Sequence, residues 1–184
     1  MAAPGGWHPE RYRDLLCVLA RQIQMDPRLR RRFDASDLVQ ETLLKATQNL
    51  EQFHGGTEAE LVKWLQEILQ NALADATRKA RARKRDVAQE EVLAVVVNDS
   101  SARLQNWLVA PDSSPSQRAE REEQLLRLAA ALAQLPEDQR DVVILRDSLG
   151  TPIRTIAEQL GRSQKAIAGL LVRGRRKLRE LLRE

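Results

Sequence analysis

Hydrophobic residues recur at three- and four-residue spacing along most of the chain, which is the pattern of amphipathic helices that pack on a core. The pattern predicts helices over residues 9–25, 34–53, 58–86, 125–135, 137–149, 151–160 and 163–182. Residues 86–97 are less decided, because the run VLAVVV suits either a short helix or a strand. We therefore expect an all-α fold.

We expect the domain boundary in a stretch rich in Ser, Asp, Asn and Pro between residues 98 and 116. Such a composition is typical of a linker. The expected organisation is a flexible N-terminus at 1–9, a helical domain at 10–97, a flexible linker at 98–117 and a second helical domain at 118–184. Two small helical domains are thus predicted.

The last two predicted helices are joined by a tight turn. We expect Thr151 to cap the first of them, with Pro152 at its first position, and Gly161 to end it in the left-handed conformation. Ser163 is expected to cap the second, whose inward stripe is Ile167, Leu171, Gly174 and Leu178. Because basic residues crowd the rest of that helix, the pair indicates a DNA-binding helix-turn-helix. A helical hairpin with a merely solvated basic face is the alternative.

The distribution of charge along the chain, more than the net charge, indicates a polyanionic partner. The formal net charge is only +4, from 30 basic and 26 acidic residues, but basic residues bunch at 28–32, 78–85 and 173–179. The single cysteine, Cys17, cannot form an internal disulfide, and no apolar run reaches 18 residues. With no signal-peptide pattern at the N-terminus, we expect a cytoplasmic protein without membrane insertion.

Two helical faces in the first half suggest binding functions. Asp37, Gln40, Glu41 and Leu44 can share one outward face of the helix at 34–53, which suits a protein partner; ordinary surface polarity is the alternative. On the next helix a second stripe carries Trp64, Asn71, Asp75 and Arg78 ahead of the basic run. Indole and guanidinium planes stack on unpaired bases and amides bind base edges, so this stripe suits partly single-stranded DNA. A core role for the tryptophan is the alternative.

The order and spacing of these motifs resemble the extracytoplasmic-function group of the sigma-70 family over nearly the whole chain. The motifs are Asp37-Leu38-Val39-Gln40-Glu41-Thr42, Trp64-Leu65, Asn71, Asp75, Arg78-Lys79, the Ser/Pro linker, Leu135-Pro136 and the helix-turn-helix with Ile156-Ala157-Glu158-Gln159-Leu160-Gly161. The resemblance implies a region 2 at about 10–97 and a region 4 at about 118–184. It also implies a factor that lends promoter specificity to RNA polymerase and is itself no enzyme.

The resemblance further implies which residues bind what. Polymerase-binding residues, on the clamp of the largest subunit, would be Asp37, Gln40, Glu41 and Leu44. The minus-10 element would be bound and opened, with one base flipped out, by Phe53, His54, Gly55, Thr57, Trp64, Asn71, Asp75, Arg78 and Lys79. The minus-35 element would be bound by Thr151, Arg162, Ser163, Gln164, Lys165, Ala168, Arg173 and Arg176. Region 4 would also meet the polymerase flap, and an anti-sigma protein is a further candidate partner.

One departure from the family pattern concerns the helix expected in the major groove. Members commonly carry long polar side chains in its first half, whereas here Ala168, Gly169, Leu170 and Val172 occupy it. Bidentate donors read bases directly, so fewer of them should mean less sequence discrimination. We expect region 4 to bind mainly through phosphate contacts and groove shape, with Gly169 marking close approach to DNA or to a packed helix.

Two other classes of function fit the sequence less well. A stand-alone helix-turn-helix regulator would leave the acidic face at 37–44 and the rod at 64–85 without a purpose. An enzyme finds little support, because His8 and His54 lie away from any Cys or carboxylate at metal-ligand spacing and no phosphate loop or nucleophile elbow is present. We expect both histidines at the surface, and no cofactor or metal.

Overall fold

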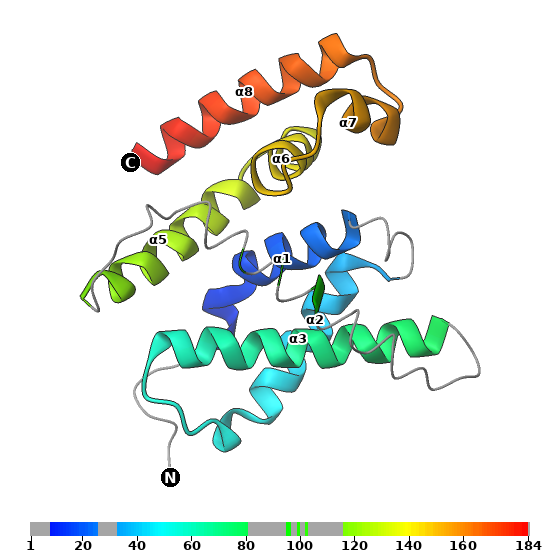
Figure 1. Cartoon of the computed structure of the whole chain (residues 1–184). Helices are drawn as coiled ribbons and strands as arrows, with labels where there is room; N and C mark the ends of the chain where they lie inside the picture. The colour runs from blue at the N-terminus through cyan, green and yellow to red at the C-terminus, as the bar shows by residue number, and fades with distance from the viewer. Residues whose placement is uncertain are drawn as a thin grey trace.

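The computed structural model describes residues 8–25, 33–80 and 116–183, together with positions 95, 96, 99 and 102. Within them the chain is helical and contains no strand, which confirms the all-α prediction (Figure 1). The elements are η1 (Pro9–Tyr12), α1 (Arg13–Met25), α2 (Ala35–Gln48), η2 (Leu50–Gln52), α3 (Glu58–Ala80), α5 (Ser116–Ala133), α6 (Glu137–Val143), the π-helical turn η3 (Ile144–Ser148), α7 (Ile153–Leu160) and α8 (Gln164–Arg183).

Helices α1, α2 and α3 pack on one another to form the first domain. Its core is built from leucines of α1 and α3 that are almost wholly removed from water: Leu15, Leu16, Leu19, Leu61, Leu65, Leu69 and Leu73. Ile68 of α3 is only partly buried at the edge of this core. Burying a leucine side chain contributes about 1.5–3 kcal/mol, so these layers dominate the stability of the domain.

Helices α5 to α8 form the second domain, in which α6 crosses α8 closely at a glycine. A Cβ atom on Gly174 would lie 2.8 Å from Cγ2 of Val143 and 3.3 Å from the carbonyl oxygen of Gln139. Only glycine therefore fits at this crossing. Between α6 and α7 the chain turns through η3 and Gly150, whose φ of +67° lies in the left-handed region.

The helix-turn-helix is formed by α7 and α8, as predicted. Gly161, with a φ of +63°, ends α7, and the hydroxyl of Ser163 accepts a 3.2 Å hydrogen bond from the backbone N–H of Ala166. The prediction for Thr151 was wrong. Pro152, not Thr151, is the N-cap residue of α7, because the backbone N–H of Thr151 instead donates to the carbonyl of Leu145 at 2.8 Å and continues the preceding turn.

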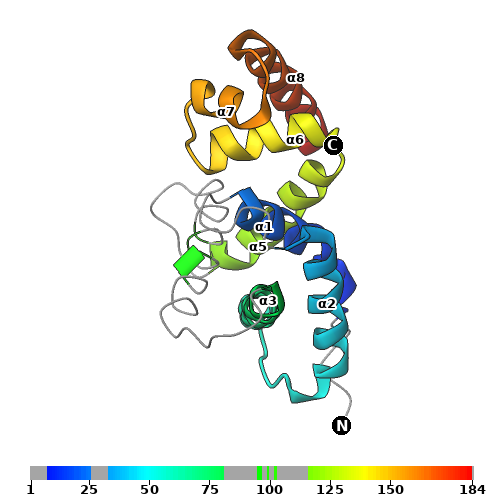
Figure 2. The same cartoon turned by 90° about the vertical axis from the view of Figure 1, so that its right-hand side faces the viewer.

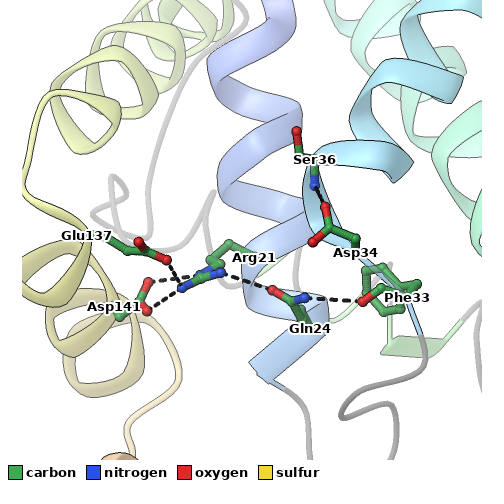
Figure 3. A network of polar contacts seen from close by, with 7 residues as sticks. All are labelled: Arg21, Gln24, Phe33, Asp34, Ser36, Glu137 and Asp141. Atoms are coloured by element: carbon green, nitrogen blue, oxygen red, sulfur yellow. Dashed lines mark hydrogen bonds and ion pairs between the residues drawn. The ribbon is translucent and has the colours of Figure 1, made fainter.

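The two domains contact each other through α1, which packs along α5. In both views α3 and α8 lie at opposite ends of the molecule, with α1 and α5 between them (Figures 1 and 2). Arg21 of α1 reaches to Glu137 and Asp141 of α6 (Figure 3). Its neighbour Gln22 donates a hydrogen bond of 2.9 Å to the hydroxyl of Ser148. The relative placement of the domains is thus held by a polar network as well as by apolar packing.

Several predictions fall outside the described residues. These are the flexible N-terminus up to residue 7, the basic stretch at 28–32, the basic run at 81–85, the undecided stretch at 86–97 apart from positions 95 and 96, and nearly all of the linker at 98–117. Of that last region the structure describes positions 99 and 102 and the start of α5 at Ser116.

Candidate nucleic-acid and partner interfaces

The acidic face of α2, defined as Asp37, Gln40, Glu41 and Leu44, points away from the core. Asp37 and Gln40 are exposed and Leu44 is 58% exposed, which is unusual for a leucine, while Glu41 is half-buried. The helix begins at a fixed point because Asp34 accepts hydrogen bonds from the backbone N–H groups of Ser36 and Asp37 at 2.8 and 3.2 Å. A negatively charged face with one exposed apolar side chain suits a basic protein partner.

Lys45 connects this face to α3. Its Nζ lies 2.9 Å from a carboxylate oxygen of Asp75 and 3.0 Å from one of Glu41. The hydrogen bond to Asp75 and then that to Glu41 raise the pKa of Lys45 above its ordinary value. Asp75, which we expected at the minus-10 element, is therefore engaged by a lysine of α2, and Glu41 is oriented by the same cation.

The loop at 53–57 before α3 is built on an aromatic pair. Phe53 is only 6% exposed, and its ring lies 5.3 Å from that of Trp64, tilted by 37°. Gly55 sits directly over the Phe53 ring, because a Cβ atom there would lie 2.3 Å from Cζ of Phe53. The phenylalanine, expected to contact DNA, is thus a support under the loop, whereas His54 and Thr57 are exposed on it.

A capping box, which the sequence analysis did not identify, fixes the end of this loop. Glu60 accepts hydrogen bonds from the backbone N–H groups of Gly56 and Thr57 at 2.8 and 3.1 Å, and the Thr57 hydroxyl accepts one from Glu60 N–H at 3.3 Å. The hydrogen bond from Gly56, followed by those from Thr57, lowers the pKa of the Glu60 carboxylate. The sequence pattern of this capping box is Thr57-x-x-Glu60.

The stripe predicted along α3 is only partly at the surface. Asn71 is exposed, while Trp64 and Asp75 are half-buried. Trp64 packs against the core, which is the alternative role considered for it, and its ring contacts that of Phe53, while part of its surface stays in water. Arg78 and Lys79 belong to α3, but their side chains lie outside what the structure describes.

Helix α8 presents a cationic outward face. Of the residues predicted there, Gln164, Lys165, Arg173 and Arg176 are exposed and Ala168 is half-buried. At 100° per residue, the line opposite the buried stripe runs through Lys165, Gly169, Val172 and Arg176. The sequence analysis left Gly169 and Val172 out of its site, although helical periodicity alone would have placed them on this line. Leu170 is buried, so it does not belong to this face.

Other predicted cations near the turn are paired with carboxylates. Arg162 lies 3.3 Å from Asp138 of α6 at an exposed position. Arg175, which pattern alone cannot tell from its basic neighbours, forms a two-pronged pair with Asp147 of η3 that raises its pKa. Arg175 is therefore a structural residue that ties α8 to η3. Arg173 and Arg176 point outward, and Arg176 lies 3.9 Å from Glu180 one turn further along the helix.

The described ranges hold neither a metal-binding cluster nor a membrane-spanning helix. No group of three or more His, Cys, Asp or Glu side chains there is placed to hold a metal ion. His8 and His54 are both exposed, as predicted. None of the described helices is long and apolar enough to cross a lipid bilayer.

Comparison with known families matches both halves of the chain. The family model for Sigma-70 region 2 matches residues 10–83, which include α1, α2 and α3. The family model for Sigma-70, region 4, matches residues 125–178, which run from α5 into α8. The two models thus match the chain on either side of the stretch between α3 and α5.

Similar proteins carry sigma-factor names. The chain is 34% identical over 148 residues, 80% of its length and 71% of the relative's, to the ECF RNA polymerase sigma factor EcfG of Rhodopseudomonas palustris. It is 35% identical over 153 residues to the ECF RNA polymerase sigma factor SigG of Mycobacterium tuberculosis, where the match spans 79% of this chain and 41% of the relative. The RNA polymerase sigma factor CnrH of Cupriavidus metallidurans is 29% identical over 149 residues, 81% of this chain and 73% of the relative. The chain therefore belongs to the extracytoplasmic-function group of the sigma-70 family, whose members direct RNA polymerase to promoters to initiate transcription.

Proposed function

We propose that this sigma factor uses three separate surfaces: the acidic face of α2 for the polymerase clamp, the 53–57 loop with α3 for the minus-10 element, and the outward face of α8 for the minus-35 element. The observation that supports the proposal most strongly is the placement of α3 and α8 at opposite ends of the molecule, each with an exposed polar or cationic face (Figure 1). Two DNA elements that are separated along a promoter need two such faces.

The acidic face of α2 is suited to docking because it is rigid and partly charged. Lys45 and Asp34 fix the orientation of Glu41 and the start of the helix. The exposed Leu44 adds apolar area at the C-terminal end of the face. Region 4 meets the polymerase flap in this proposal through faces of its helices other than the outward one of α8.

At the minus-10 element the proposal assigns direct contacts to His54, Thr57 and Asn71, with Arg78 and Lys79 on the backbone. Phe53 is a positioning residue that holds the loop through Gly55 and Trp64. Flipping a base out of the stack costs a few kcal/mol, which a preformed loop and a stacking surface can offset. The capping box at Thr57 and Glu60 supplies that preformation.

The protein carries out no chemistry in this proposal and acts in the cytoplasm on the polymerase. Its partners are core RNA polymerase and promoter DNA, and an anti-sigma protein would have to cover the acidic face of α2 or the outward face of α8. The stand-alone regulator would leave the region 2 match and the acidic face of α2 without a role.

Transcription in vitro tests the proposal. Core polymerase from the same source, a genomic fragment library and this protein should yield protein-dependent transcripts that share two upstream elements. The double variant Asp37→Arg with Glu41→Arg should abolish capture by the core enzyme, because it reverses the charge of the acidic face. The control Glu51→Arg changes an exposed carboxylate of η2 and should leave capture intact. Equal capture of both variants would contradict the docking face.

A further inference from the structure

Val172 is the most exposed large hydrophobic side chain of the described residues, at 67%. A single exposed valine needs no explanation by itself. The surroundings of Val172 make its exposure unusual, because α8 is otherwise cationic on this side, with Lys165, Arg173 and Arg176 exposed to water. Valine is also a weaker helix former than the Lys or Arg that the helix uses elsewhere.

The geometry of α8 places Val172 at the middle of the outward face. The buried stripe of Ile167, Leu171, Gly174 and Leu178 packs toward the other helices of the domain. The opposite line carries a cation at each end, Lys165 and Arg176, and Gly169 and Val172 between them. This line of residues is thus charged at its two ends, and at its centre it has one apolar side chain, Val172, and one residue without a side chain, Gly169.

Gly169 lies one turn before Val172 and is not required for packing. A Cβ atom there would meet only Nη1 of Arg173, at 3.3 Å, which is the far end of a flexible side chain. The sequence left open whether Gly169 marks close approach to DNA or to a packed helix. The packed helix is excluded within the described part of the chain, because no other helix approaches Gly169 there. The missing side chain leaves room for a ligand surface to approach the helix beside Val172.

We propose that Val172 is a specificity-determining residue of the minus-35 interface that contacts the 5-methyl group of a thymine in the major groove. Thymine is the base that presents an apolar group there, and small apolar side chains read it by contact. Lys165 and Arg176 hold the flanking phosphates on either side, and Gly169 allows the close approach. The inference rests on the proposed function of α8, and it adds base readout to an interface otherwise dominated by phosphate contacts.

The test uses holoenzyme and a promoter on which it initiates. Each thymine of the minus-35 element is replaced in turn by deoxyuridine, which lacks only the methyl group. Wild-type holoenzyme should lose about three- to fivefold in affinity at one position, the effect of one buried methyl group. Holoenzyme with Val172→Ala should show no loss of affinity on deoxyuridine replacement at that same position. At every other thymine its response to the replacement should equal that of the wild type. Arg176→Gln, the matched control on the same line, should weaken binding to every template alike and keep the sensitivity.

Three results would overturn the inference. The first is a Val172→Ala variant that keeps the full sensitivity at every thymine, and the second is a minus-35 element without thymine. The third is a uniform loss of affinity of this variant on all templates, which would indicate a protein partner for Val172. Failure of the proposed function looks different, because wild-type holoenzyme would then give no transcript that depends on the upstream element. Thermal unfolding of Val172→Ala followed by circular dichroism serves as the folding control, and an exposed position should leave it unchanged.

Discussion

The guanidinium of Arg21 in α1 donates hydrogen bonds of 2.9 and 2.6 Å to the two carboxylate oxygens of Asp141 in α6. It also reaches Glu137 at 2.6 Å and Gln24 at 3.1 Å (Figure 3). The two carboxylates raise the pKa of Arg21, the hydrogen bond to Asp141 most of all. Asp141 is buried, so its carboxylate depends on this partner. A forked pair with one buried member therefore joins region 2 to region 4.

Replacing Arg21 by Ala should lower the free energy of unfolding by about 1.5–3 kcal/mol, the value of hydrogen bonds to a charged group whose partner is left buried. Arg21→Lys keeps the charge but not the fork and should lose an intermediate amount. Urea denaturation measures both. The control is Arg13→Ala, which removes the exposed pair with Glu10 at 2.8 Å and should cost less than about 1 kcal/mol. Equal losses for Arg21→Ala and Arg13→Ala would contradict the role of the pair.

The docked arrangement should open when the factor binds polymerase and a promoter. Elements named minus-10 and minus-35 lie about 25 base pairs apart, or about 85 Å at 3.4 Å per base pair. A compact chain of this length has a radius of gyration of only about 16 Å. Spin labels at Glu51→Cys and Glu158→Cys, in a Cys17→Ser background, should move apart in the promoter complex. A distance that is the same free and bound would show that the docking of α1 on α5 persists.

Two glycines of α8 should respond in opposite ways to the same substitution. Gly174→Ala places a methyl group 2.8 Å from Val143 and should destabilise the protein by about 1–2 kcal/mol, because overpacking outweighs the better helix propensity. Gly169→Ala meets no such obstacle and should raise stability by about 0.5–1 kcal/mol while weakening promoter binding. Thermal unfolding and holoenzyme binding to promoter DNA measure the two effects. A stabilised Gly174→Ala variant would contradict the close crossing of α6 and α8.

A feature of the fold or of the site could be predicted from sequence when the residues that form it lie close together along the chain. The helices, the turn at Gly161 and the exposure of Leu44 follow from local spacing and were confirmed. The pair of Arg21 with Asp141 joins residues 120 positions apart, and no local pattern predicts it.

Local patterns also leave some roles undecided. The pattern predicts Thr151 as the cap of α7, but a backbone bond from Thr151 to Leu145 ties that residue to the preceding turn and the helix begins one residue later. Phe53, the last residue of the helix predicted over 34–53, is a buried support because Gly55 and Trp64 close over it. Among the arginines of α8, the tertiary position of Asp147 selects Arg175 for a structural role.

Binding to the upstream element should depend strongly on salt. Lys165, Arg173 and Arg176 are the outward cations of α8, and each phosphate contact contributes about 0.9 to the slope of log affinity against log salt concentration, so a slope near −3 is expected from this helix. Arg176→Gln should reduce the slope by about 1. A titration of the full chain on duplex DNA with the minus-35 element gives the value. A slope near zero would contradict the phosphate-dominated interface.

The central claim is that the two ends of the molecule read two promoter elements. The most direct measurement places a DNA-cleaving iron chelate on single cysteines in a Cys17→Ser background, at Lys165→Cys on α8 or at Asn71→Cys on α3, and maps cleavage in holoenzyme bound to a promoter. The account predicts cuts within the minus-35 element from α8 and within the minus-10 element from α3. Cleavage of the same element from both positions, or of neither, would contradict it.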